Sequence, residues 1–291
     1  MTGTIGSPRR SGVTGALRRA ALPFALLAVL AGCNSATPPA ATGPAVATNT
    51  AGAGLIPQTS PDIHRIEALG RTIYVLDNAA ARATDLAFAQ GADLRASDMR
   101  GWVTDTSGPG VLVRFIRQKG DRFEAAYDVT VDENGRAATF ARPVDARLTP
   151  DQSLQFAARQ LAIAQAKPPL CEGPYTTVVF RDPGSSNWRI YLLAATTDPD
   201  LKMFGGHQRI LVSADGKRIL SSENLSKTCL APRIKADPGH TIAFSFITEL
   251  LSPTPIETHV FANLLYRLPL LIMTADRRKW AVDQGRIWGI R

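Results

Sequence analysis

The stretch FEAAYDVTVDENGRAATFA, residues 123–141, contains two runs rich in β-branched and aromatic residues on either side of a turn sequence. Asn134-Gly135 is a dipeptide that supplies the positive backbone angles of a tight hairpin turn. The stretch therefore predicts an antiparallel hairpin between strands 123–131 and 137–141. A further β-rich run, 111–117, precedes it and predicts a third strand of the same meander.

A similar pattern recurs about 80 residues later in QRILVSADGKRILSS, residues 208–222. There Asp215-Gly216-Lys217 takes the place of Asn134-Gly135-Arg136. Each meander follows a helix-start signal, Ser60-Pro61-Asp62 in the first and Thr149-Pro150-Asp151 in the second, with proline at the first helical position. This order predicts a duplicated unit of one helix followed by an antiparallel meander.

The other elements follow from periodicity and turn residues. Helical spacing predicts helices that begin near Ser60 and at Ala79, the second ending at Gly91, and a third helix that runs to about Ala166. The predicted strands after that helix are 175–181, 188–196, 208–213, 218–222, 241–248, 256–264, 270–274, 279–282 and 286–290.

The order of helix, two strands and an Asp-Gly hairpin resembles the PepSY type of extracytoplasmic domain, over less than a third of the chain. We expect an α+β fold made of two helix-plus-antiparallel-meander units with a β-rich C-terminal segment. The expected organisation is a signal peptide (1–32), a flexible tether (33–60), a first unit (61–148), a second unit (149–233) and the C-terminal segment (234–291).

Leu30-Ala31-Gly32-Cys33 ends a short apolar run that four arginines and no acidic residue precede. It resembles the lipobox of bacterial lipoproteins, in which the cysteine is acylated and becomes the first residue of the mature protein. The apolar run is much shorter than the roughly 20 residues that span a bilayer. An ordinary secretory signal with a chance cysteine is the alternative.

The resemblance implies export and a stable membrane anchor, since two or three acyl chains hold a protein firmly. Asn34 follows the cysteine, where an aspartate usually retains lipoproteins at the inner membrane. We therefore expect the outer membrane, with the protein facing the periplasm. The next residues, up to about Ser60, are mostly Ala, Thr, Pro and Gly with almost no charge, a composition typical of a flexible tether.

Composition excludes some partners. The chain has 291 residues, 45% hydrophobic and 20% charged, which is typical of a globular protein. Its net charge of +8 falls to +4 once the four arginines of the signal segment are removed. That charge and the expected export argue against a nucleic-acid partner. The longest apolar run after Cys33, 260–275, is broken by Arg267 and Pro269, so no membrane-spanning segment is expected there.

Lipidation would use Cys33 and leave Cys171 and Cys229 as a pair in a compartment where disulfides persist. We expect a disulfide between them, with two buried free thiols as the alternative. Two cysteines and four scattered histidines give no zinc-binding spacing, so we expect no metal and no cofactor.

The sequence contains no G-x-S-x-G, H-E-x-x-H or S-x-x-K motif. Glu257 and His259 are the strongest catalytic candidates. In the strand predicted over 256–264 they would lie two residues apart on one face, where the carboxylate could orient the imidazole. The alternative, which we favour, is a solvated strand face on which alanine substitution costs no more than about 0.5 kcal/mol. His64, His207 and His240 lie near predicted turns and helix starts, and we expect all three at the surface.

Two further sets are candidates for partner binding. Arg277, Arg278 and Lys279 form a basic turn beside Trp280 that could contact anionic lipid or an acidic partner, or could be a solvated hairpin tip with the tryptophan in the core. Phe156 and Ile163 project from the helix opposite its main apolar face. Such a helix is usually packed between layers, and a partner-binding patch is the alternative.

We expect a lipid-anchored envelope protein that acts as a binding or structural module, with an envelope protein as a possible partner. The competing hypothesis is a periplasmic hydrolase that uses His259 as a general base or metal ligand.

Overall fold

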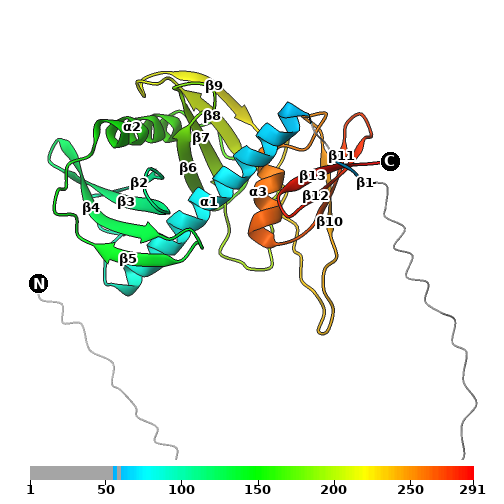
Figure 1. The fold of residues 1–291 in the computed structure, drawn as a ribbon, viewed down its shortest axis with the longest axis horizontal. Helices are drawn as coiled ribbons and strands as arrows, with labels where there is room; N and C mark the ends of the chain where they lie inside the picture. Colours follow the sequence, from blue (N-terminus) through cyan, green and yellow to red (C-terminus); the bar gives the residue numbers. More distant parts are fainter. Residues whose placement is uncertain (1–54, 58–59) are drawn as a thin grey trace, which may run out of the picture. The chain divides into compact units, whose positions relative to one another are not determined.

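The computed structural model describes residues 55–57 and 60–291. They form an α+β fold with a β-rich C-terminal region, as the sequence predicts (Figure 1). The signal segment, Cys33 and most of the expected tether lie outside the described residues.

The described part of the chain contains three helices and thirteen strands. The helices are α1 (Pro61–Ala89), α2 (Pro150–Ala164) and α3 (Glu257–Tyr266). The strands are β1 (Leu55–Pro57), β2 (Met99–Asp105), β3 (Val111–Lys119), β4 (Arg122–Val131), β5 (Ala137–Ala141), β6 (Tyr175–Arg181), β7 (Trp188–Ala194), β8 (Gln208–Val212), β9 (Ile219–Asn224), β10 (Ser245–Glu249), β11 (Leu270–Thr274), β12 (Lys279–Asp283) and β13 (Arg286–Ile290).

Helix α1 runs without a break through the two helical stretches that the sequence predicts separately. The Ser60 hydroxyl caps it by accepting a hydrogen bond from the Asp62 N–H at 3.3 Å. Gly91, just past its end, has φ of +76°, which glycine adopts without strain. The helix contacts strands of all three sheets (Figure 1), so it is the element that joins them.

The first sheet has the order β2-β3-β4-β5 and the second the order β6-β7-β8-β9. Both are antiparallel meanders that follow a helix, and their last hairpins match in detail. Gly135 and Gly216 occupy the two turns with φ of +72° and +71°. A register shift also interrupts the pairing in each hairpin, between Thr130 and Val131 and between Leu211 and Val212. The two sheets are therefore built on one repeated plan.

Helix α2 begins at the predicted Thr149-Pro150 signal, where Thr149 and Gln152 form a capping box. Phe156 packs on the first sheet, with Val103 and Ile116, while other buried residues of the helix pack on the second sheet. The helix is thus held between the two sheets, as the apolar residues on both of its sides predict.

The third sheet has the order β1-β13-β12-β11-β10, with β10 parallel to β11 and the other pairs antiparallel. Its first strand, β1, consists of residues that the sequence places in the tether. Helices α1 and α3 pack on one face of the sheet. Glu67 of α1 accepts a hydrogen bond from the Ile287 N–H at 2.7 Å, which fixes the helix to β13.

The strand predicted over 256–264 is wrong, because residues 257–266 form helix α3. Nearly every residue of its first two turns is buried, so the segment lacks the polar face that identifies a helix in sequence. No helix within 60–291 is long and apolar enough to cross a membrane.

Candidate functional site

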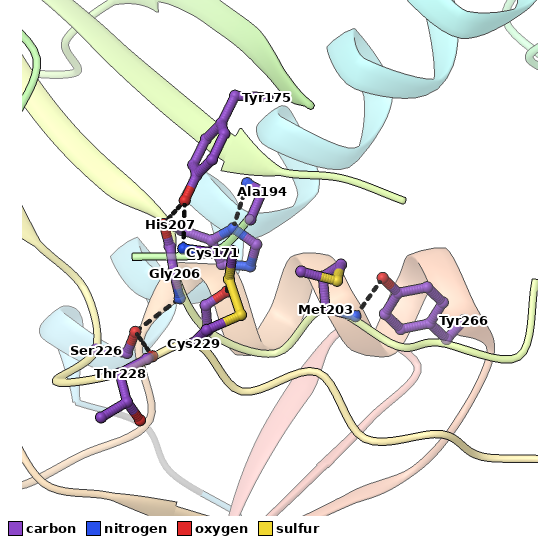
Figure 2. The surroundings of a disulfide bond; sticks show 11 residues. Cys171, Tyr175, Ala194, Met203, Gly206, His207, Ser226, Thr228, Cys229 and Tyr266 are labelled. Atoms are coloured by element: carbon purple, nitrogen blue, oxygen red, sulfur yellow. Dashed lines mark hydrogen bonds between the residues drawn. A yellow bond between two sulfur atoms is a disulfide. The ribbon is translucent and has the colours of Figure 1, made fainter. Parts of the chain in front are cut away.

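The predicted disulfide is present in the second unit. Cys171 and Cys229 are bonded, with their Cα atoms 4.9 Å apart (Figure 2). Tyr175 connects the neighbouring chain segments, because its hydroxyl accepts from the Cys171 N–H at 3.1 Å and donates to the Gly206 carbonyl at 3.0 Å. A Cβ at Gly206 would overlap the Cys171 sulfur, so glycine is required there. Cys171 is buried and Cys229 is exposed, so a reductant can approach from the Cys229 side.

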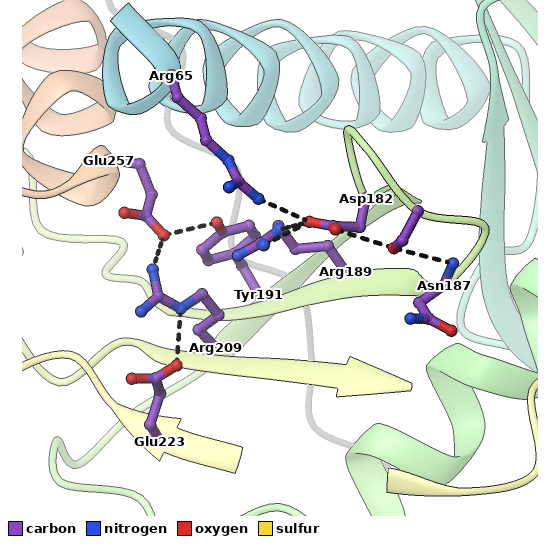
Figure 3. Close-up of polar contacts among 9 residues, drawn as sticks. Arg65, Asp182, Asn187, Arg189, Tyr191, Arg209, Glu223 and Glu257 are labelled. Atoms are coloured by element: carbon purple, nitrogen blue, oxygen red, sulfur yellow. Dashed lines mark hydrogen bonds and ion pairs between the residues drawn. The ribbon is translucent and has the colours of Figure 1, made fainter. Parts of the chain in front are cut away.

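Glu257 is not on a solvated strand face as predicted. It lies in the first turn of α3 with only 2% of its surface exposed. The Tyr191 hydroxyl donates to its carboxylate at 2.7 Å, and Arg209 pairs with the same oxygen (Figure 3). Burial would raise the pKa of Glu257, but Arg209 and the Tyr191 hydroxyl together lower it below its ordinary value. The carboxylate is therefore charged and joins α3 to the second sheet.

The same cluster continues along the surface of the second sheet. Arg209 also pairs with Glu223 at 2.9 Å, and Asp182 pairs with Arg189 and, at 3.7 Å, with Arg65 of α1 (Figure 3). Each arginine in this set is matched by a carboxylate. The arrangement is a cross-linking network between α1, α3 and the sheet, and it leaves no uncompensated charge to attract a ligand.

His259 is buried as well, and 3% of it is exposed. Its Nδ1 accepts a hydrogen bond from the Ile256 N–H at 3.1 Å, which places the proton on Nε2. Nε2 lies 3.6 Å from a carboxylate oxygen of Glu249. Burial lowers the pKa of His259 to about 4, so the ring is neutral at pH 7. A general base needs access to its substrate, whereas this side chain is almost completely buried. Its hydrogen bond to the Ile256 N–H makes it a cap for α3.

His207 is also buried, contrary to the surface position predicted for it, while His64 and His240 are exposed as expected. Its Nδ1 accepts from the Ala194 N–H at 3.0 Å (Figure 2). Burial lowers the pKa of His207 to about 4. Among the residues described by the structure, no group of three or more His, Cys, Asp or Glu side chains is arranged to hold a metal ion.

A cleft of about 680 Å³ opens between the first and second sheets. Helix α1 contributes Arg71 and Val75 to its lining, α2 contributes its N-terminal turn, and the ends of β2 and β6 form two of its sides. Apolar side chains, among them Phe180 and Trp188, alternate with hydroxyl and charged groups. This volume is within the range of ligand sites, about 300 to 1,000 Å³.

The strands beside this cleft, β2 and β6, are the edge strands of their sheets. They lie side by side without pairing, because side chains of α2 form hydrogen bonds with the backbone groups that the two strands turn toward each other. Gln155 accepts from the Thr104 N–H and donates to the carbonyls of Thr104 and Val179, at 3.2, 3.0 and 3.1 Å. One turn further, Arg159 donates to the Arg100 carbonyl and to the Thr177 hydroxyl, at 3.1 and 2.8 Å.

The partner-binding candidates fall into different environments. Phe156 is buried and unavailable to a partner, whereas Ile163 is 44% exposed. The basic turn Arg277-Arg278-Lys279 is exposed and Trp280 is in the core, as expected for a hairpin tip. Sequence reasoning missed Gln155 and Arg159, which lie on the buried side of an amphipathic helix. The signal that could have identified them is the presence of polar residues on the side of the helix that is otherwise apolar.

Comparison with protein families, curated proteins and solved structures gave no match to this chain.

Proposed function

We propose that this protein is an exported, lipid-anchored protein of the cell envelope that binds an extended polypeptide segment in the cleft between β2 and β6. The lipobox-like sequence ending at Cys33 supports the anchor, and Asn34 favours the outer membrane with the protein facing the periplasm. The disulfide between Cys171 and Cys229 fits an oxidising compartment.

The observation that carries the binding proposal is the pair of strand edges that face each other across an open cleft. An exposed edge presents unpaired N–H and C=O groups, and an added strand satisfies them. The Val179 carbonyl points away from β7, toward the side chains of α2. Because the backbone N–H and C=O groups of a strand point to alternate sides from one residue to the next, those of Arg181 also point away from β7. Arg181 lines the cleft beyond the Gln155 bridge, where a bound segment would lie.

The side chains around this edge indicate what the segment would contain. Val75 is 48% exposed on α1 and offers an apolar contact beneath the segment. Arg181 stacks on Trp188 and pairs with Asp151 at 2.5 Å. The side of the cleft opposite α1 therefore offers both apolar and charged groups. An extended segment with an apolar residue facing α1 and polar neighbours fits this lining.

The test is site-specific photo-crosslinking in cell envelopes. A photoreactive amino acid at Val75 should capture a polypeptide, while the same probe at Val144, a fully exposed residue of the loop after β5, should not. In a deletion strain, Val75→Lys should fail to complement at matched protein level and Val144→Lys should succeed. Identical adducts at both positions, or full complementation by Val75→Lys, would contradict the peptide-binding proposal.

The anchor is tested separately. Cys33→Ala should leave an unprocessed precursor without acyl mass. If that variant matures and fractionates with the membrane as the wild type does, the protein is not anchored at Cys33.

A further inference from the structure

The third sheet has one face covered by helices and one face that is largely apolar and turned away from them. The strand register determines which residues share the second face. Its members are Phe246 and Thr248 of β10, Leu271 and Met273 of β11, Lys279, Ala281 and Asp283 of β12, Arg286, Trp288 and Ile290 of β13, and Leu55 of β1. We call this set the outer face.

Burial confirms the division of the sheet into two faces. The large apolar side chains that β10 to β13 place on the inner face, such as Ile272 and Val282, are at most 5% exposed. On the outer face, Phe246 is 59% and Leu55 is 46% exposed, at opposite edges of the sheet. Both ends of the row are therefore exposed to solvent. A half-buried sheet normally carries polar residues on its solvent side, so an apolar row there needs an explanation.

We infer that the outer face docks on an anionic lipid surface. Basic side chains lie at one end of the apolar row: Lys279 is on the face itself and Arg277 is in the adjoining turn, while Arg286 and Arg278 are paired with Glu67 and Asp276. Residues 276–291 contain five basic and two acidic side chains, a net side-chain charge of +3. Each basic residue close to an anionic leaflet adds electrostatic attraction, and exposed aromatic and aliphatic side chains add apolar contact.

The area of the outer face argues against a second copy of this chain as its occupant. Five strands spaced about 4.8 Å apart, each about five residues long at about 3.3 Å per residue, give a face of roughly 350 Å². This flat footprint is small for a stable dimer, which buries about 800 Å² of solvent-accessible surface on each partner. A two-fold contact through this face would also bring the basic residues of both copies together, which is unfavourable. A lipid surface has the opposite charge and sets no minimum area.

The position of the proposed anchor points to the same occupant, and in this respect the inference rests on the proposed lipidation. Only 21 residues separate Cys33 from Leu55, the first residue of β1. The composition of residues 34–54 predicts a flexible tether, and a flexible chain of this length averages about 25 Å between its ends. Because β1 belongs to the third sheet, that sheet is the part of the fold that the anchor would hold nearest to the membrane.

The experiment uses the unlipidated chain that begins at Asn34, which keeps every described helix and strand. Its sedimentation with vesicles of phosphatidylglycerol mixed with phosphatidylethanolamine is compared with its sedimentation with vesicles of phosphatidylcholine alone. We expect binding to the anionic vesicles that weakens as salt is added. Binding to neither vesicle, or equal binding to both, would overturn the inference.

Two variants and two matched controls make the test specific. Phe246→Ser should abolish vesicle binding, and Arg277→Gly with Lys279→Gln should weaken it about 30-fold, from two charges at about 1 kcal/mol each. Arg277 has φ of +65°, so glycine fits its backbone and folding should be preserved. The first control is Val144→Ser. The second is Lys119→Gln with Arg122→Gln, at the end of β3 and the start of β4. Both should bind as the wild type does.

Variants that bind as tightly as the wild type, with unchanged melting temperatures, would refute the assignment of the outer face. A dimer without vesicles that Phe246→Ser dissociates would instead make this face a protein interface and would also refute docking on lipid. Because the probe carries no acyl chain, failure here leaves the proposed anchor at Cys33 and the peptide cleft untouched. Conversely, if Cys33 carries no acyl chain, the proposed anchor is wrong, but binding of the unlipidated protein to vesicles would still support the outer face.

Discussion

Replacing Glu257 with alanine should destabilise the protein strongly, although sequence analysis predicts an almost neutral change. The side chain is 2% exposed and holds two partners from the second sheet, Tyr191 and Arg209 (Figure 3). Its removal leaves the Tyr191 hydroxyl without its acceptor and the Arg209 guanidinium with only Glu223. The change therefore acts on the join between α3 and the second sheet.

The magnitude follows from the burial of the two partners. Removing one member of a buried ion pair costs about 3 to 5 kcal/mol, because the remaining charge loses its compensation. The Arg209 side chain is 25% exposed and keeps its contact with Glu223, which places the cost at the lower end, about 3 kcal/mol. Glu223 is 47% exposed, so Glu223→Ala should cost less than about 1 kcal/mol.

Urea denaturation of the disulfide-bonded protein at pH 7 measures both costs. Glu257→Gln should lie between the wild type and Glu257→Ala, since an amide oxygen can still accept from Tyr191. A double-mutant cycle of Glu257→Ala with Tyr191→Phe should show a coupling free energy of at least about 0.5 kcal/mol. The reasoning is refuted if Glu257→Ala costs no more than Glu223→Ala with unchanged denaturant dependence.

The pH dependence gives an independent check with a definite sign. The Arg209 pair and the Tyr191 hydrogen bond outweigh burial and hold the pKa of Glu257 below its ordinary value of 4.5. The folded protein therefore releases this proton more readily than the unfolded chain does. The stability that this difference provides is complete above about pH 4.5 and is lost as the pH falls below that value. Glu257→Gln should lack that part of the acid sensitivity.

Two other predictions concern the buried histidines and the disulfide. Burial lowers the pKa of His207 and His259 from 6.5 to about 4, so the unfolded chain binds more protons in that range and stability should fall with decreasing pH by about 1.4 kcal/mol per pH unit for each histidine. Burial raises the pKa of Asp77 to about 6, so this group acts in the opposite direction. The quantity to measure is therefore the slope of unfolding free energy against pH, which should be smaller in His259→Gln than in the wild type. An equal slope in the two proteins would contradict the prediction. The disulfide joins Cys171 and Cys229 at a sequence separation of 58, and its reduction should lower the free energy of unfolding by about 4 kcal/mol. Urea titrations with and without reductant measure this difference. A difference below about 1 kcal/mol would show that the loop constraint is unimportant.

Sequence patterns predicted the meanders well because local chemistry decides both their strands and their turns. Strands 137–141, 175–181, 270–274 and 286–290 have the predicted bounds. The strand 175–181, for example, ends at Asp182-Pro183, which is unsuited to a strand. The matching turns at Gly135 and Gly216 also follow from residue type, because both require a positive φ. The cysteine pair was predictable by elimination.

Helix α3 was not predictable by the same means because its stabilising contacts come from other elements. Its N-cap, Ile256, offers no polar side chain, and His259 on the helix takes that role by accepting the Ile256 N–H. Its C-terminal residue in the left-handed conformation is Arg267 instead of glycine. With both end signals missing and both sides buried, only the β-branched residues remained as a pattern, and they favoured a strand.

Strand β2 was missed for a related reason. Gly101 interrupts it with φ of +119° at an irregularity in the pairing, and glycine inside an apolar run normally argues against a strand. A Cβ at this position would overlap the guanidinium of Arg159, which donates to the neighbouring Arg100 carbonyl. The glycine is therefore explained by a helix almost 60 residues further along the chain, which no local pattern contains.

This contact also explains why a cleft exists. Had β2 and β6 paired, their backbone groups would have satisfied one another in one continuous sheet. Instead, Gln155 and Arg159 satisfy several of them with side chains, at the cost of burying a guanidinium whose pKa burial lowers to about 10. Both bridges lie at one end of the two facing strand edges, and beyond Gln155 the strands border the cleft. Polar residues on the buried side of α2 thus keep two sheets apart at the place where we propose that a third strand binds.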